Sequence, residues 1–187
     1  MQMAMHTHAN KSAQNLARLN THIAPATEKD VSKIIDIINK EAKLSGAVLP
    51  VNETEVTSWI KNGLSFVVKT TAGEIIGHHS AYIWPESKWI ELRAAIVAPE
   101  YRGNGINKEL KKSVMDAILK KYPNATIVSV KNKASNGRTL LEELGFKKIP
   151  QSEAPKELFE IGPKNEEYDI YVLNPRINSE LSVLARA

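Results

Sequence analysis

The sequence predicts an α/β fold, in the broad sense that includes α+β proteins, with a mixed sheet and helices on both faces. Three observations lead to this prediction. Short apolar runs typical of strands alternate along the chain with stretches whose apolar residues recur at helical spacing. Strands and helices do not fall into separate blocks, which favours one layered domain. The 187 residues suffice for one such domain with a sizeable core.

The elements follow in order from these patterns. The expected strands are residues 22–27, 64–70, 74–85, 88–99, 125–131, 146–149 and 167–175. The expected helices are residues 26–43, 52–63, a helix within 98–121, and residues 136–145. The first helix carries isoleucines at helical spacing and has Thr27 as its expected N-cap, and Gly63 is expected to stop the second.

The helix within 98–121 has one apolar face and several lysines expected to lie largely off it. The apolar face consists of Leu110, Val114, Ala117 and Ile118, and the lysines are Lys108, Lys111, Lys112 and Lys120. Residues 150–166 form a loop that contains Pro and has no clear pattern. The predicted organisation is a mobile tail over residues 1–20, one domain over 21–175 and a C-terminal tail over 176–187.

Composition excludes several classes of protein. The chain has no Cys, which excludes disulfides, thiolate metal sites and a cysteine nucleophile, and no metal is expected. No apolar run reaches the length of a membrane span, so no membrane association is expected. The first twenty residues lack the pattern of a secretory signal. A cytoplasmic protein is therefore the expectation.

Positive charge is concentrated in one part of the chain. The net charge is +4, but residues 102–148 hold eleven Lys or Arg and four Asp or Glu, a local excess of +7. Such an excess beside a glycine-rich helix start favours an anionic partner. For the lysines alone, a solvated helix face is the more common explanation. Nucleic-acid binding is not favoured, because no aromatic platform or reading-helix motif accompanies the charge.

The glycine-rich joint "YRGNGIN", residues 101–107, stands between an apolar run and a helix. A helix start offers unpaired backbone N–H groups and a partial positive charge. Gly103 and Gly105 lack Cβ atoms, so an anion can approach those donors closely, and Arg102 can pair with phosphate. Strand, glycine-rich turn and helix together are a phosphate-binding arrangement. The patterns of nucleoside triphosphatases and of nicotinamide dehydrogenases are both missing.

The stretch "AAIVAPEYRGNGINKEL" resembles the pyrophosphate-binding motif of the GNAT superfamily of acyl-CoA-dependent N-acyltransferases. Residues Arg102 to Ile106 match that motif, and Asn107 departs from it where Gly or Ala is usual. Downstream, "LLEELGFKKI" is similar to the last helix of the family and its Leu-Gly-Phe ending. The resemblance covers most of the chain. It implies a single GNAT-like domain with a mostly antiparallel central sheet whose central strands splay apart.

The resemblance also implies the cofactor and its site. Acetyl-CoA would be the cosubstrate, and its pyrophosphate would be held by N–H groups of the turn: Arg102, Gly103, Asn104, Gly105, Ile106 and Asn107. The strand end at Ile96 and Val97 would hydrogen-bond the pantetheine amides. Asn132 and Asn136 flank the start of the last helix, where the family often has an Asn that touches the cofactor. Each is otherwise an ordinary turn or N-cap residue.

Acetyl transfer to an amine needs a base for the amine and an acid for the thiolate. Glu91 is the candidate base, because period-two alternation puts it on the same face as Val97 and because it resembles the strand Glu of histone-type members. The alternative is a Glu paired with Arg93. His78 and His79 are weaker candidates, since a strand His is more often a packed or exposed polar residue.

Many family members place a Tyr, as the acid, at the position of Leu141. Solvent, Tyr101 or Tyr168 would then have to protonate the thiolate, and Tyr101 is equally plausible as a packing residue. The predicted function is transfer of an acetyl group from acetyl-CoA to a primary amine, of a small molecule or a peptide, by direct attack in a ternary complex. The alternative is an acyl-CoA-binding regulatory or interaction module with little catalysis, which Leu141 and Asn107 favour. The sequence does not identify the acceptor, and it leaves a homodimer open.

Overall fold

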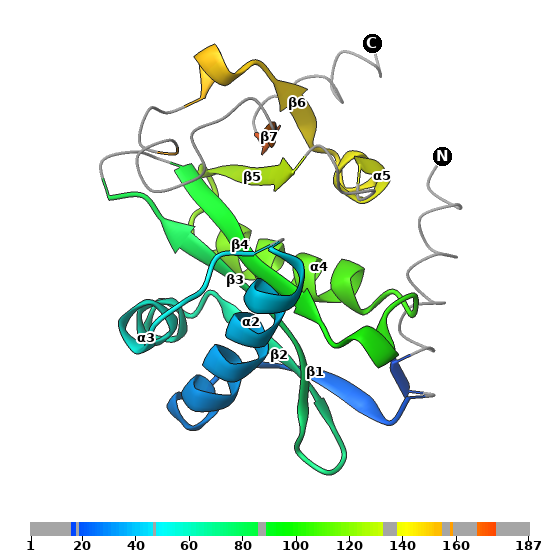
Figure 1. Ribbon diagram of the computed structural model, residues 1–187. Helices are drawn as coiled ribbons and strands as arrows, with labels where there is room; N and C mark the ends of the chain where they lie inside the picture. The colour runs from blue at the N-terminus through cyan, green and yellow to red at the C-terminus, as the bar shows by residue number, and fades with distance from the viewer. Residues whose placement is uncertain are drawn as a thin grey trace. The chain divides into compact units, whose positions relative to one another are not determined.

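The computed structural model describes residues 16–17, 19–46, 48–85, 89–132, 138–154, 158 and 168–174. Its strands form a seven-stranded sheet in the order β1-β2-β3-β4-β5-β7-β6 (Figure 1). The strands are β1 (Thr21–Pro25), β2 (Ser65–Thr70), β3 (Ile75–Ile83), β4 (Trp89–Val97), β5 (Thr126–Asn132), β6 (Lys147–Ile149) and β7 (Tyr168–Leu173). The helices are α2 (Val31–Ser45), α3 (Glu53–Lys61), α4 (Ile106–Lys121) and α5 (Arg138–Glu143).

The sheet is mixed and mostly antiparallel, which confirms the predicted fold class. Strand β1 pairs antiparallel with β2, β2 with β3, β5 with β7, and β6 with β7. The parallel pair is β4 with β5, and its register runs from Trp89 opposite Thr126 to Leu92 opposite Ser129. Strand β4 continues beyond that register to Val97. Helix α4 supplies the long connection that a parallel pair requires.

The chain divides into two compact units, and β3 and β4 contribute residues to both. The first unit comprises residues up to 81 and residues 93–117, and the second comprises residues 82–92 and those from 118 onwards. The core of the first unit contains Val68, Ile76, Val97, Ile106 and Leu110. The second unit has its own core of Trp84, Val128, Leu158 and Ile170. Each unit thus has an apolar centre.

Helix boundaries in the first unit follow from local chemistry. Before α2, the backbone N–H and the Oγ1 of Thr27 both donate to Asp30 Oδ2, at 2.9 Å each. Before α3, Asn52 Oδ1 accepts from the backbone N–H of Glu55, and Glu55 Oε2 accepts from that of Asn52. These contacts satisfy N–H groups that a helix start leaves unpaired. Helix α2 ends at Gly46, whose φ of 62° is left-handed.

Helices cover both faces of the sheet in the first unit, as the sequence predicts (Figure 1). Neighbouring residues of β3 show this directly, because their side chains point to opposite faces of a strand. Trp59 of α3 stacks on the ring of His78, with centroids 6.0 Å apart. Lys111 of α4 contacts the next residue, His79, on the other face. Strand β3 therefore lies between α3 and α4.

Two histidines and a lysine lie buried in this unit. His78, His79 and Lys111 are 0%, 1% and 6% exposed. The prediction that Lys111 lies off the packed face of its helix is therefore wrong, because its ammonium reaches His79 Nε2 at 3.1 Å. Burial lowers the pKa of His78 to about 4 and the pKa of Lys111 to about 8. Burial, and then the neighbouring Lys111 and His78, lower the pKa of His79 well below its ordinary value.

The packed part of the chain begins before residue 21. Leu16 and Leu19 pack against the core of the first unit. The carbonyl of Leu16 accepts a hydrogen bond from Thr21 Oγ1 at 3.0 Å, and the carbonyl of Asn20 accepts one from the N–H of Thr71. The domain boundary expected after residue 20 therefore moves back at least to Leu16. Residues 1–15 and the expected C-terminal tail lie outside the described residues.

A chain that starts at Thr21 should be less stable than one that starts at Ala13. The shorter chain loses the partly buried Leu16 and Leu19, which together stabilise by roughly 2 kcal/mol. The melting temperature should fall by about 4–8 °C. Thermal unfolding followed by circular dichroism measures this. Equal melting temperatures for the two chains would mean that the leucines contribute nothing.

Stability should fall as the pH is lowered from 7 to 5. As the pH falls, a histidine that is buried in neutral form is protonated first in the unfolded chain, near pH 6.5. Its contribution to the free energy of unfolding is therefore complete above pH 6.5 and is lost as the pH falls towards 4. His78 alone should account for about 2 kcal/mol over this range. Urea titrations at several pH values measure the slope. His78→Phe should flatten it, whereas His22→Phe, which changes an exposed histidine of β1, should leave it as in the unchanged protein.

Candidate cofactor and catalytic site

The glycine-rich joint forms a tight turn at the start of α4. A short 3-10 helix, η2 (Pro99–Tyr101), follows β4 and leads into the turn. Gly103 and Gly105 have φ values of 81° and 79°, a left-handed conformation that residues with a Cβ rarely adopt. The glycines are thus needed for the shape of the turn as well as for room. A Cβ built on Gly103 would meet nothing within 4 Å, so the turn faces open space.

The turn leaves several backbone donors available. In the described part of the chain, the N–H groups of Gly103, Gly105, Ile106 and Asn107 donate no backbone hydrogen bond. The N–H of Arg102 differs, because it donates to the carbonyl of Pro99 at 3.2 Å. The open donors sit at the positive end of the α4 dipole, which favours an anion there. The arrangement can bind phosphate through the backbone alone.

The side chain of Arg102 is held by the protein itself. Its Nε donates to the carbonyl of Val97 at 2.9 Å, and its Nη2 forms an ion pair with Glu41 of α2 at 2.8 Å. The guanidinium therefore ties the end of β4 to α2. Its expected pairing with phosphate would have to compete with the Glu41 carboxylate. Arg102 therefore helps to build the turn, a role that sequence analysis did not predict.

The two asparagines of the turn differ in their surroundings. Asn104 Nδ2 lies 3.2 Å from the carbonyl of Tyr101 and 3.3 Å from that of Arg102, so the side chain closes the turn on itself. Asn107, where the family motif usually has Gly or Ala, is exposed at the first turn of α4. Its side chain is thus not packed into the core. Its backbone N–H remains among the open donors.

Helix α4 is set against β3 at Gly77. A Cβ on Gly77 would come within 3.2 Å of both Leu110 Cδ1 and the Ile96 carbonyl, and Ile106 Cγ2 would lie 3.6 Å away. A side chain at this position would require these neighbours to move by a few tenths of an ångström, so glycine favours the close approach of helix and strand. The first two turns of α4 are therefore fixed against the sheet. Gly77 is a contributor to the site that sequence analysis missed.

The end of β4 leads into the turn through an irregular backbone. Ile96 and Val97 are buried, and the N–H of Ala98 bonds the carbonyl of Ile76 at 2.8 Å. Ala94 has a φ of 51°, a left-handed value in the middle of a strand. The alternation used to place Glu91 on the face of Val97 does not carry across this residue. The assignment of Glu91 as base therefore has to rest on its resemblance to the family position.

The other predicted acid and base residues have the following surroundings. Glu91 is half-buried on β4, where its backbone pairs with Val128. Tyr101 packs against the apolar core of the first unit, as its alternative interpretation expects. Leu141 is 3% exposed, so the position of the family's usual Tyr is filled by a packed apolar side chain. Asn132 ends β5 opposite Tyr168, and Asn136 lies outside the described residues.

The buried histidines do not suit a role as base. Both ring nitrogens of His78 and of His79 lie within 3.1 Å of protein atoms. An acceptor amine would have to displace these partners inside the core. The packed interpretation of the two residues is therefore the better one. The pair of consecutive histidines in an apolar strand is the feature of the sequence that could have indicated this packing.

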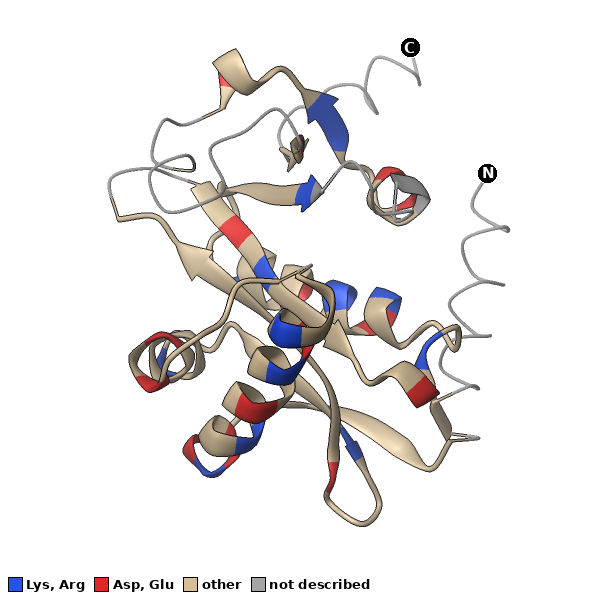
Figure 2. Ribbon diagram, viewed as in Figure 1, with Lys and Arg blue, Asp and Glu red and all other residues tan. Residues whose placement is uncertain are grey.

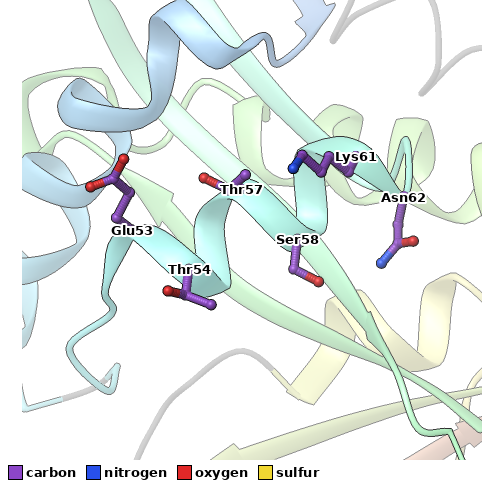
Figure 3. A pocket seen from close by; sticks show the side chains of 6 residues that line it. All are labelled: Glu53, Thr54, Thr57, Ser58, Lys61 and Asn62. Carbon is purple, nitrogen blue, oxygen red and sulfur yellow. The ribbon is translucent and has the colours of Figure 1, made fainter.

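A polar hollow lies on the outer face of α3. Its lining residues are Glu53, Thr54, Thr57, Ser58, Lys61 and Asn62 (Figure 3). The hollow is open to solvent, and it offers a carboxylate near one end and an ammonium near the other. Over the described ranges, no group of three or more His, Asp or Glu could hold a metal ion. No described helix is long and apolar enough to cross a membrane.

Charge is mixed over the helices of the first unit. Lys and Arg alternate with Asp and Glu on both α2 and α4 (Figure 2). Lys112 pairs with Glu109 one turn before it, at 3.1 Å. The positive excess of residues 102–148 is thus partly balanced locally. This mixture suits a small anionic group better than a long polyanion.

Comparisons with known proteins agree with this geometry. Residues 33–146 match the family model described as the acetyltransferase (GNAT) family. The N-acetylglutamate synthase of Neisseria gonorrhoeae, solved with coenzyme A and N-acetyl-glutamate, is 17% identical with a TM-score of 0.67 and covers 82% of this chain. This chain spans 35% of that synthase.

Two further solved structures are similar over nearly their whole length. Rv2747 of Mycobacterium tuberculosis, in complex with CoA and NLQ, is 15% identical with a TM-score of 0.65. The match covers 82% of this chain and 98% of Rv2747. The protein yncA of Salmonella typhimurium, solved with its cofactor acetyl-CoA, is 18% identical with a TM-score of 0.61. The match covers 83% of this chain and 94% of yncA. The comparison with curated proteins gave no match. The fold, the glycine-rich turn and the family model agree, and the chain belongs to the acetyltransferase (GNAT) family.

Proposed function

We propose that the protein transfers an acetyl group from acetyl-CoA to a primary amine in a ternary complex. The observation that carries the proposal is the set of open N–H groups at the start of α4, in a turn shaped by Gly103 and Gly105. The donors at Gly103, Gly105, Ile106 and Asn107 would hold the pyrophosphate. Asn104 and Arg102 shape the turn, and the Ile96–Val97 segment would contact the pantetheine amides. Structural neighbours solved with CoA or acetyl-CoA support this cofactor.

The reaction we propose needs one bond made and one broken. The amine nitrogen attacks the thioester carbonyl carbon, a C–N bond forms, and the C–S bond breaks to release the CoA thiolate. Glu91 accepts the proton of the amine, directly or through a water molecule. The thiolate then takes a proton from solvent, because Leu141 is apolar and Tyr101 is packed. If Tyr101 or Tyr168 supplied this proton instead, its substitution by Phe would lower turnover.

The second candidate function is binding of acyl-CoA with little catalysis. Its support is the packed Leu141, which leaves the family's usual acid position without a proton donor. Thiol release separates the two functions. Mixing the protein with acetyl-CoA and an amine releases free CoA thiol if transfer occurs, whereas a binding module changes only the affinity for acetyl-CoA.

The acceptor is best sought among amines that carry a carboxylate. Glu53 and Lys61 of the α3 hollow could pair with an ammonium and a carboxylate respectively. A neighbouring structure holds N-acetyl-glutamate, the acetylated form of an amine that carries carboxylates. A panel of amino acids, diamines and short peptides, each assayed for thiol release, would rank the classes. Charge reversal at Glu53 should alter that ranking if the hollow receives the acceptor.

Gly105→Val should weaken coenzyme A binding at least tenfold, which corresponds to about 1.4 kcal/mol. The added side chain would block approach of the pyrophosphate to the N–H groups of the turn. Isothermal titration calorimetry measures the affinity. Gly73→Val is the matched control, because Gly73 has the same φ of 79° in a turn between β2 and β3. It imposes similar backbone strain and should leave the affinity unchanged. Equal affinity for both variants would contradict the proposed cofactor site.

Glu91→Gln should lower turnover on the order of 100-fold to 10,000-fold near neutral pH and leave acetyl-CoA binding intact. The substitution keeps the shape of the side chain and removes its ability to accept a proton. The deficit should shrink as pH rises, because more of the amine is then already neutral. Steady-state thiol release from pH 6 to 9 measures it. Glu74→Gln, at an exposed position between β2 and β3, is the control. Activity of Glu91→Gln equal to that of the control across this range would remove Glu91 from the mechanism.

A further inference from the structure

Two consecutive histidines of β3 reach two consecutive carbonyl groups of β4. His78 Nδ1 lies 3.1 Å from the carbonyl oxygen of Ala94. His79 Nδ1 lies 3.1 Å from the carbonyl oxygen of Arg93 and 3.1 Å from that of Ser80. The two rings lie on opposite faces of the strand, since one stacks on Trp59 and the other contacts Lys111. The backbone at Arg93 and Ala94 is therefore held from both faces of the sheet.

The second nitrogen of each ring also has a partner. Ser65 Oγ of β2 lies 3.0 Å from His78 Nε2, and Lys111 Nζ of α4 lies 3.1 Å from His79 Nε2. Ser80 Oγ adds a donor to the Arg93 carbonyl at 3.3 Å. Each histidine thus connects a side chain of a neighbouring element to the backbone of β4. A single substitution can break either connection.

The partners determine which ring nitrogen carries the proton. Carbonyl oxygens only accept, so Nδ1 must carry the hydrogen in both rings. Nε2 then accepts, from the hydroxyl of Ser65 in one ring and from the ammonium of Lys111 in the other. Both histidines are neutral Nδ1–H tautomers. This agrees with their complete burial, which disfavours the charged form.

The carbonyls held in this way flank the irregular point of β4. The pairing register of β3 and β4 shifts by one residue along the hairpin, because Trp84 N–H bonds the Trp89 carbonyl whereas Ala98 N–H bonds the Ile76 carbonyl. Ala94, between them, takes a left-handed φ of 51°. Such a conformation is strained in a residue with a Cβ and persists only where the surroundings enforce it. The histidine bonds supply that enforcement.

We infer that His78 and His79 are positioning residues that hold the Ala94 bulge and thereby set the path of β4 through Ile96 and Val97, where the strand end would meet the pantetheine arm. The inference rests on the proposed cofactor site. A bulge redirects every backbone group that follows it in the strand, and Ile96 is only two residues away. Among the described residues, the hydrogen bonds and ring contacts of the two histidines do not include the pyrophosphate turn. Their loss should therefore affect one part of the cofactor and spare the other.

The test compares two ligands that share the phosphates. Coenzyme A carries the pantetheine arm, and 3′-phospho-ADP is the same molecule without it. His78→Phe keeps a ring beside Trp59 but removes both hydrogen bonds. It should weaken coenzyme A binding at least tenfold and change 3′-phospho-ADP binding less than twofold. His22→Phe is the matched control, because it makes the same exchange at an exposed site on β1 and should change neither affinity.

Each outcome of the calorimetry is informative. Unchanged coenzyme A affinity in a folded His78→Phe protein overturns the inference, and so does an equal loss for both ligands, since that is the effect of a general structural defect. Failure of the unchanged protein to bind either ligand would instead refute the proposed cofactor site. Ser65→Ala removes the partner of His78 Nε2, and Lys111→Met removes the partner of His79 Nε2. Each should cause the same selective loss of coenzyme A affinity, but a smaller one.

A measurement on the unchanged protein keeps the inference testable if the variants do not fold. Nitrogen-15 NMR of the imidazole rings distinguishes the two neutral tautomers. At pH 7, two of the histidines should show the Nδ1–H form, which is the minor form of a free imidazole side chain. An Nε2–H tautomer at either His78 or His79 would mean that the ring does not donate to β4, and the inference would fail.

Discussion

The start of α4 is the constraint on which the candidate site depends. A helix must leave its first N–H groups without intrahelical partners, and side chains near the starts of α2 and α3 bind such groups locally, as Thr27 with Asp30 and Asn52 with Glu55 do. Helix α4 instead meets a glycine turn that leaves backbone donors at Gly103, Gly105, Ile106 and Asn107 open among the described residues. An anion is the partner that completes such a helix start.

The surroundings of that helix start keep it in place. Gly77 brings α4 against β3, and Arg102 ties the end of β4 to Glu41 of α2. On the other side of the turn, the Ala94 bulge sets the direction in which β4 arrives. These contacts come from three elements distant in sequence. The open donors are thus a rigid feature, which reduces the ordering cost of binding.

Sequence analysis predicted those parts of the molecule that local pattern determines. The order of strands and helices, the cap at Thr27 and the turn of Gly103 and Gly105 were all readable, because periodicity and glycine placement act over a few residues. The family resemblance, carried by the turn and by Leu-Gly-Phe, is confirmed. The catalytic role of Glu91 stays a prediction.

Features that depend on tertiary contacts could not be predicted. Nothing in "LRAAIV" signals that Ala94 adopts a left-handed conformation, since alanine there is enforced by neighbours and not by its own preference. Lys111 was placed off the packed face by charge, and only its contact with His79 shows that it is buried. The side chain of Arg102 could not be assigned to Glu41, which lies 61 positions earlier in the chain.

The parallel pairing of β4 with β5 has a consequence for how the chain folds. An antiparallel hairpin can form from its turn outward, but a parallel pair cannot, because the chain must first travel back along the sheet. Here the η2 turn and α4 make that return before Trp89 can meet Thr126. Closing this long connection costs chain entropy before the contacts between β4 and β5 can form and offset that cost. We therefore expect strands β5, β7 and β6 to join the sheet late, after α4 has formed against β3.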